Sequence, residues 1–180
     1  MTIHLTKDQL RQALGELNHY LAEKNLTGEI CICGGAAMVL AFNARLTTKD
    51  VDAIFEPPTT IRKAAEAVAR KLSLPADWLN DGVKGFLSAK SKLTEKDMYQ
   101  HSHLRVVRPT AEYLLAMKCM ASRQVGYDTP GDKRDIAFLC ERLKLKTAED
   151  ALKIVEEYYP ASQIQPKTQF MLQEVFHEKN

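Results

Sequence analysis

The first part of the chain alternates between helical and strand-like patterns of apolar residues. Behind the capping box Thr6-Lys7-Asp8-Gln9, leucines recur three and four residues apart and predict a helix over residues 6–24. The apolar run 29–33 predicts a strand covered on both faces, which stops at Gly34-Gly35. Residues 36–44 are rich in Ala, Met and Leu and predict a short helix.

This alternation continues to residue 72. Residues 50–55 alternate polar and apolar side chains and predict a strand that Pro57-Pro58 closes. A third helix, capped by Thr59 or Thr60, is predicted to run to about Leu72. The order helix, strand, helix, strand, helix favours an α/β core.

The second half of the chain is mainly helical. Residues 73–100 predict a short helical turn and then irregular chain, and residues 103–107 predict another strand. Pro109-Thr110 opens a helix, a loop follows at 126–131, and three more helices are predicted at 132–143, 147–158 and 167–177. We therefore expect an α/β (α+β) fold, with a small mixed sheet and flanking helices in residues 1–125 and a helical C-terminal region in residues 126–180.

Composition and charge add little to this picture. The 180 residues are 45% hydrophobic and 27% charged, which is typical of a globular protein, and the net charge of +2 is too small to indicate a nucleic-acid partner. Since no signal-like start and no apolar run of roughly 20 residues is present, we expect a cytoplasmic protein with no membrane contact. Cys31, Cys33, Cys119 and Cys140 lack metal-ligand spacing and are expected to be buried thiols.

Candidate chemistry lies in the predicted strand 50–55. Asp50 and Asp52 are two residues apart, so their side chains share one strand face, with Cα atoms roughly 6.5–7 Å apart. Both carboxylates can then reach one divalent cation, and phosphoryl transfer depends on such a cation to neutralise the phosphates. Paired acids at a strand start are more often a solvated edge, and Glu95-Lys96-Asp97 repeats the spacing elsewhere.

Gly34-Gly35 is the second candidate feature. A glycine turn between a strand and a helix lets the backbone approach a phosphate closely, while the amides of the following helix favour negative charge. Such a turn is more often no more than a tight connection. If the strands before and after the next helix are neighbours in one sheet, the turn faces Asp50 and Asp52 across a single cleft.

Several of these residues occur in an order that resembles a known family. The set Gly34-Gly35-Ala36-Ala37, Arg45, Thr47 and Asp50-Val51-Asp52 resembles the minimal nucleotidyltransferase superfamily, which shares a glycine-led turn, a helix and an acidic pair. The string GGAAMVLAFNARLTTKDVDAIF is similar to bacterial nucleotidyltransferase-like proteins related to the AbiEii type of toxin. The likeness continues through residues 74–80, 113–118, 132–136 and 158–160, and so covers nearly the whole chain.

The resemblance implies a set of site residues. Asp50 and Asp52 would be catalytic and would hold magnesium or manganese. Nucleotide contacts would come from Gly34, Gly35, Arg45, Thr48, Lys118 and Arg123, and Asp132 and Asp135 match further acidic positions.

Other roles stay open for some of these residues. Lys118 can equally be a solvated lysine on an amphipathic helix. Arg45 can be an ion-pair partner of Asp50 or Asp52, and Asp135 can be a charge that complements a helix start.

The implied activity is transfer of a nucleoside monophosphate from a nucleoside triphosphate to an RNA or protein hydroxyl, with an antitoxin protein as a further partner. Active relatives usually carry a third carboxylate on a later strand, whereas His103–Val107 contains no acid. Asp97, Asp132 or Asp135 could substitute for it in space. The turn also reads Gly-Gly-Ala where many catalytic relatives have Gly-Ser. The alternative is a non-catalytic nucleotide- or protein-binding module on the same fold.

Two further features have ordinary explanations. His101 and His103 would share a strand face, but no other ligand pair is near them in the sequence, so zinc is not favoured. Trp78 is expected to pack against the preceding helix rather than to stack on a base.

Overall fold

The computed structural model describes residues 4–122 and 130–178 of the chain. They form two compact units, one made of residues 4–85 with 93–108 and the other of residues 86–92 with 109–122 and 130–178. The expected mixed α/β class is confirmed, since a small mixed sheet with flanking helices is followed by a helical region. The expected domain boundary at residue 125 and most of the expected loop at 126–131 lie outside the described residues and stay predictions.

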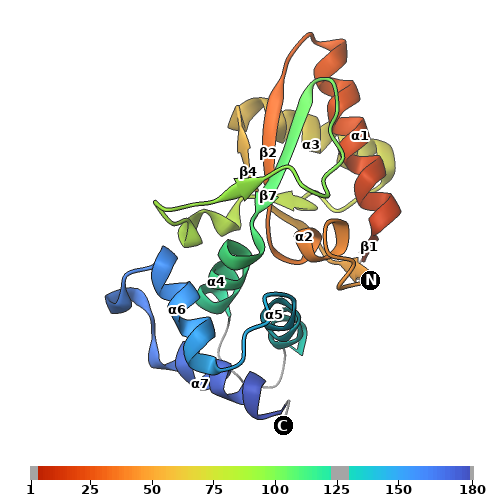
Figure 1. Ribbon diagram of the computed structural model, residues 1–180. Helices are drawn as coiled ribbons and strands as arrows, with labels where there is room; N and C mark the ends of the chain where they lie inside the picture. Colours follow the sequence, from red (N-terminus) through yellow and green to blue (C-terminus); the bar gives the residue numbers. More distant parts are fainter. Residues whose placement is uncertain (1–3, 123–129, 179–180) are drawn as a thin grey trace. The chain divides into compact units, whose positions relative to one another are not determined.

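The first unit is built around a five-stranded mixed sheet (Figure 1). Its strands and helices, in chain order, are β1 (Leu5–Thr6), α1 (Lys7–Glu23), β2 (Gly28–Ile32), α2 (Gly34–Leu40), β3 (Thr47–Thr48), β4 (Val51–Glu56), α3 (Pro58–Leu72), β5 (Leu79–Asn80), the 3-10 helix η1 (Gly82–Phe86), β6 (Leu93–Thr94) and β7 (Leu104–Pro109). The sheet order is β5-β4-β2-β7-β6, with β4 antiparallel to β2 and β7 parallel to it. β1 and β3 form a separate antiparallel pair.

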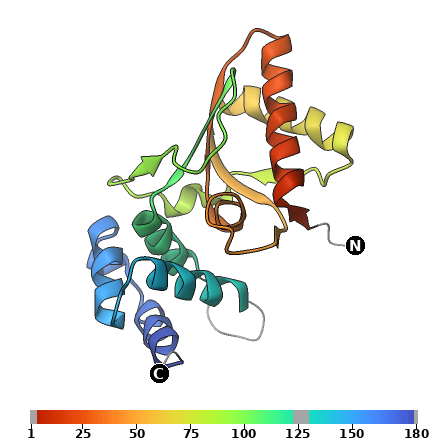
Figure 2. The same cartoon turned by 45° about the vertical axis from the view of Figure 1, so that its right-hand side comes forward.

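Helices α1 and α3 cover one face of this sheet (Figure 2). Both helices approach the sheet closely at Gly28 of β2, because a Cβ built there would lie 2.6 Å from Ile61 of α3 and 3.4 Å from Leu21 of α1. Strand side chains alternate between faces, so Ile30 and its partner in register Val106 point toward the same helices as Gly28. The fully buried side chains of this face form the core of the unit.

Local sequence signals explain most element starts, with one correction. Thr6 accepts a hydrogen bond from the Gln9 amide while the Gln9 side chain accepts from the Thr6 amide, which confirms the predicted capping box. The prediction that Thr59 or Thr60 caps the third helix is wrong, because α3 already begins at Pro58. Proline suits the first helical position, since its fixed φ matches the helix and no amide there needs a partner.

Trp78 packs as expected from the sequence. Its side chain is buried, and its indole Nε1 donates a 3.0 Å hydrogen bond to the carbonyl of Ala65 in α3. The Trp78 carbonyl accepts a 2.7 Å hydrogen bond from the Val51 amide. The tryptophan therefore ties the start of β4 to α3.

The second unit is helical. It contains α4 (Ala111–Ala121), α5 (Pro130–Arg142), α6 (Ala148–Tyr158), the 3-10 helix η2 (Ala161–Gln163) and α7 (Pro166–His177). Tyr113 of α4 stacks on Tyr158 of α6, with ring centroids 4.8 Å apart, and its hydroxyl accepts a 2.9 Å hydrogen bond from the Ser88 amide. The predicted helical character of the C-terminal region is confirmed.

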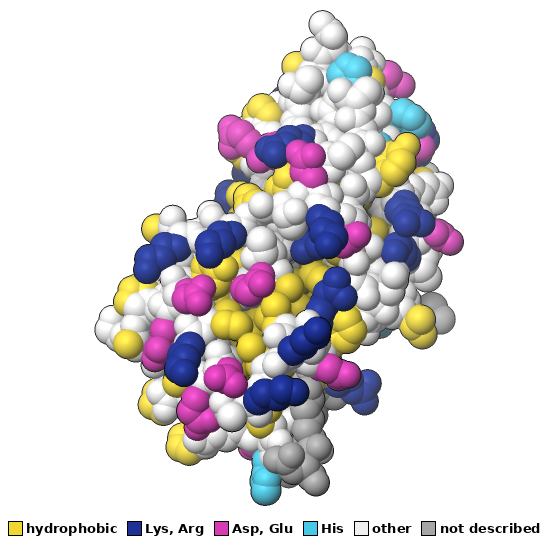
Figure 3. Space-filling view, in the orientation of Figure 1, with side chains coloured by type: hydrophobic (Ala, Val, Ile, Leu, Met, Phe, Trp, Pro, Cys, Tyr) yellow, Lys and Arg dark blue, Asp and Glu magenta, His cyan; other side chains and the backbone are white. Residues whose placement is uncertain are grey.

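Charged side chains of both signs share the surface, and the described helices are short or polar. Lys and Arg are interspersed with Asp and Glu over the face drawn in Figure 3, in keeping with the small net charge. No described helix combines the length and apolar character needed to cross a membrane.

Candidate functional site

The glycine turn and the acidic strand lie against each other. Gly34 has φ +55°, a left-handed conformation, and a Cβ built on it would lie 2.6 Å from Oδ2 of Asp52. The Cys33 amide donates a 2.8 Å hydrogen bond to the Asp52 carbonyl, which fixes the end of β2 beside the start of β4. The sequence-based condition that the two strands be sheet neighbours is therefore met. Glycine is required at position 34 both by its backbone angle and by the nearby carboxylate.

Gly35 makes a similar close approach on its other side. A Cβ built on Gly35 would lie 2.6 Å from Oγ1 of Thr48 and 3.3 Å from Nη1 of Arg45. Thr48 is buried, and its hydroxyl donates a 3.1 Å hydrogen bond to the carbonyl of Asp50. The structure thus gathers the expected site residues Gly34, Gly35, Arg45, Thr48, Asp50 and Asp52 at one place in the first unit.

Asp50 differs slightly from its expected position, because β4 begins at Val51 and Asp50 directly precedes it. Its carboxylate is half-buried, and Oδ2 accepts a 3.3 Å hydrogen bond from Nδ2 of Asn80. Burial, followed by the negative charges of Asp52 and Asp77, raises the pKa of Asp50 above its ordinary value, and Lys49 and Asn80 oppose this only in part. The carboxyl group therefore lies where an added positive charge would be favourable.

Two neighbours of the acid pair were not recognised in the sequence. Asn80 of β5 pairs in register with Asp52 of β4, which brings its amide to Asp50. Asp77 lies in the preceding turn and adds a third negative charge near Asp50. A two-residue strand has no period that a sequence pattern could reveal. Only the pairing of β5 with β4 brings Asn80, and the turn with Asp77 before it, close to Asp50.

The residues at this place suit a magnesium ion bound together with a phosphate. Magnesium typically keeps several waters and takes one or two protein carboxylates plus substrate phosphates, so a dedicated protein cage is not needed. Asp50 and Asp52 supply two carboxylates, and the missing side chain at Gly34 lets the Asp52 carboxylate lie against the turn. Among the residues that the structure describes, no group of three or more His, Cys, Asp or Glu side chains has metal-binding geometry.

Cysteines border the site without forming part of it. All four are free and buried, as expected from the sequence. The Sγ atoms of Cys31 and Cys33 lie 4.0 Å apart, and hydrogen bonding to Cys31, then burial, raises the pKa of Cys33 well above its ordinary value. The Cys33 thiol is therefore protonated at neutral pH and is a poor nucleophile or metal ligand.

The remaining expected residues lie in the second unit. Lys118 of α4 is buried, with 7% of its side chain exposed, so the alternative of a solvated lysine is wrong. Its Nζ lies 2.5 Å from Oδ2 of Asp135, which is 2% exposed, and 3.5 Å from Oδ1 of Asp132. Arg123 lies outside the described residues. The roles of these four residues at a nucleotide stay predictions.

Known proteins offer no match to this chain. No family model, curated protein sequence or solved structure matches the chain.

Proposed function

We propose that the protein is a nucleotidyltransferase that moves a nucleoside monophosphate from a nucleoside triphosphate to a hydroxyl group of RNA or of a protein, with Asp50 and Asp52 holding magnesium or manganese. The observation that carries the proposal is the contact between the acid pair and the diglycine turn: the Asp52 carboxylate lies where a Cβ of Gly34 would be. The reaction type and an antitoxin partner come from the sequence resemblance.

Each group at this place has a role that its geometry supports. Because Gly34 has no side chain, the Asp52 carboxylate lies against the turn, and a metal ion that it held would be close to a phosphate bound at the turn. Asn80 holds one oxygen of Asp50 and so orients its carboxylate. When bound, the metal ion supplies charge neutralisation for the phosphates. Arg45, beside Gly35, is suited to contact a phosphate oxygen.

A labelled-nucleotide assay tests this proposal. Purified protein is incubated with α-labelled nucleoside triphosphates, magnesium and separate pools of RNA and protein acceptors, and incorporation is measured. We expect Asp50→Asn and Asp52→Asn each to lower incorporation by at least about 100-fold, because each removes a charge that positions the metal. Glu66→Gln, an exposed change on α3, is the matched control and keeps full activity. Equal incorporation by Asp52→Asn and the wild type would overturn the proposal.

The alternative is a binding module without catalysis. Two observations favour it. Strand β7 carries no acid, and no cluster of three metal-binding side chains occurs among the described residues. It predicts that a nucleoside triphosphate with magnesium raises the thermal midpoint of the wild type but not of Asp52→Asn, with no incorporation into any acceptor. The two measurements together separate the candidates.

A further inference from the structure

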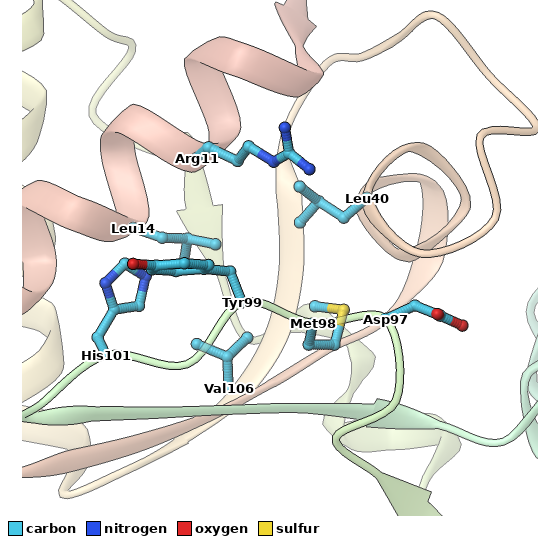
Figure 4. A pocket seen from close by; sticks show the side chains of 8 residues that line it. All are labelled: Arg11, Leu14, Leu40, Asp97, Met98, Tyr99, His101 and Val106. Atoms are coloured by element: carbon cyan, nitrogen blue, oxygen red, sulfur yellow. The ribbon is translucent and has the colours of Figure 1, made fainter.

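A cavity in the first unit lies away from the acid pair (Figure 4). Its volume is about 440 Å³, within the range of roughly 300–1,000 Å³ typical of small-molecule sites. It is lined by Arg11, Leu14, Leu40, Asp97, Met98, Tyr99, His101 and Val106. The cavity opens to solvent past the exposed Tyr99 side chain, while its inner wall is aliphatic, so a ligand could enter it and bury apolar surface there.

The cavity and the acid pair occupy opposite faces of the sheet. Val106 pairs in register with Ile30, so it points toward the face that α1 and α3 cover. Ala53 of β4 pairs with Ile32 and shares that face, so its neighbour Asp52 points to the other one. The cavity therefore does not depend on the proposed nucleotide site, and the inference below is independent of the proposed function.

Polar contacts help to hold the outer wall of the cavity in place. The Gln100 side chain donates a 2.6 Å hydrogen bond to the Val106 carbonyl and accepts a 3.0 Å hydrogen bond from its amide. Arg108 donates to the Lys96 carbonyl at 2.9 Å and lies 3.4 Å from Oδ2 of Asp97. These contacts fix residues 96–101 to β7, so the cavity is formed before any ligand arrives, which lowers the entropic cost of binding.

The rim of the cavity carries an uneven balance of charge. Arg11 of α1 lies above the cavity in Figure 4. Its Nη1 is 3.9 Å from Oδ1 of Asp8, whose side chain is almost fully exposed. Asp97 is partly neutralised by Arg108. Burial, with a smaller effect from His19, lowers the pKa of His101, so its imidazole is neutral at pH 7. The guanidinium of Arg11 is thus the charge most available to a ligand.

Tyr99 adds an aromatic surface at the same rim. Its side chain is 73% exposed, which is unusual for a large aromatic residue, and its ring contacts the His101 ring edge to face at 4.9 Å. Figure 4 shows Tyr99 and His101 together on one side of the cavity, with Arg11 above and Val106 below. A flat apolar ligand would cover the tyrosine ring while its charged end met Arg11.

We propose that this cavity binds a small organic anion with an apolar body the size of one or two aromatic rings. The aliphatic side chains of Leu14, Leu40 and Val106 contact the body, and Arg11 pairs with the anionic group. The aliphatic lining provides affinity, and the single cation at the rim selects the charge.

Paired fluorescent probes test the proposal on the full chain. The anionic probe is 8-anilinonaphthalene-1-sulfonate, and the matched neutral probe is N-phenyl-1-naphthylamine, which has the same rings without the sulfonate. We expect saturable binding of the anion, about fivefold weaker in Arg11→Gln and about twofold tighter in Asp97→Asn. Asparagine tolerates the positive φ of residue 97, so the second variant keeps the backbone. The neutral probe should bind both variants and the wild type alike.

Controls make each outcome decisive. Arg70→Gln removes the same charge from α3 and should leave both probes unaffected, whereas Arg11→Lys should restore part of the anion affinity. Thermal unfolding establishes that each variant is folded. Unchanged anion affinity in both Arg11→Gln and Asp97→Asn would overturn the proposal. So would displacement of the bound anion by peptides but not by 1-naphthylacetate, because that would assign the cavity to a protein partner.

Discussion

The two acidic clusters of this protein are built in opposite ways. In the first unit, Asp50 and Asp52 lie close together at a glycine turn, and burial, followed by the charge of Asp52, raises the pKa of Asp50. In the second unit, Asp132 and Asp135 enclose the ammonium group of Lys118. The second cluster already contains its cation, whereas the first would gain stability from one that binds. The acid pair of the first unit is therefore the cluster arranged to receive a positively charged ligand.

The largest expected effect concerns the second cluster. Lys118→Met leaves Asp135 buried beside an apolar side chain, and we expect it to lower the free energy of unfolding by about 3–5 kcal/mol. Urea denaturation followed by circular dichroism measures this change. The double variant Lys118→Met with Asp135→Leu removes both charges and should recover most of the loss. A loss below about 1 kcal/mol in the single variant would show that this pair is not buried as described.

The next effect concerns the turn in the first unit. Gly34→Ala places a Cβ against Asp52 at a left-handed φ, and we expect a loss of about 1–3 kcal/mol in the free energy of unfolding. Gly15→Ala is the matched control, because Gly15 lies inside α1 with no atom within 4 Å of the built Cβ. It should instead stabilise the protein by about 0.5–1 kcal/mol. Equal effects of the two substitutions would contradict the contact between turn and acid pair.

The smallest expected effect concerns the repulsion between Asp50 and Asp52. Because the pKa of Asp50 is raised in the folded state, stability falls as the pH rises from the ordinary pKa of an aspartate to the raised pKa of Asp50, and the loss is complete above the raised value. Asp50→Asn should therefore raise the thermal midpoint at pH 7, and the gain should vanish at pH 3, where the carboxyl group is protonated in both folded and unfolded chains. Thermal scans from pH 3 to pH 8 measure the difference. A wild type that is more stable than Asp50→Asn at pH 7 would contradict the repulsion.

Much of the fold follows from the sequence, because long periodic segments determine their own structure. The leucines of α1 and its capping box predict that helix almost to the residue. Errors occur where a single backbone property decides, as at Pro58, which begins α3 ahead of the threonines. Residues 73–100 contain β5, η1 and β6, and strands of two residues form only through their neighbours in the sheet.

The candidate site, too, could be predicted from the sequence only in part. Gly34-Gly35 and the acid pair are recognisable from local sequence, and the pairing of β2 with β4 brings them together. Asn80 and Asp77 reach Asp50 from another part of the chain, and no local pattern marks them. The burial of Lys118 depends on the packing of α4 against α5, which a helical pattern alone does not specify.

In the function that we propose, the acid pair and the diglycine turn bind one metal ion together with a nucleotide. Electron paramagnetic resonance of Mn²⁺, titrated into the protein with a non-hydrolysable nucleoside triphosphate, tests it most directly. We predict one tightly bound Mn²⁺ per chain in the wild type, with binding lost in Asp52→Asn and in Gly34→Ala but retained in Gly15→Ala. Equal Mn²⁺ binding by the wild type and Asp52→Asn, or none by either, would contradict the account.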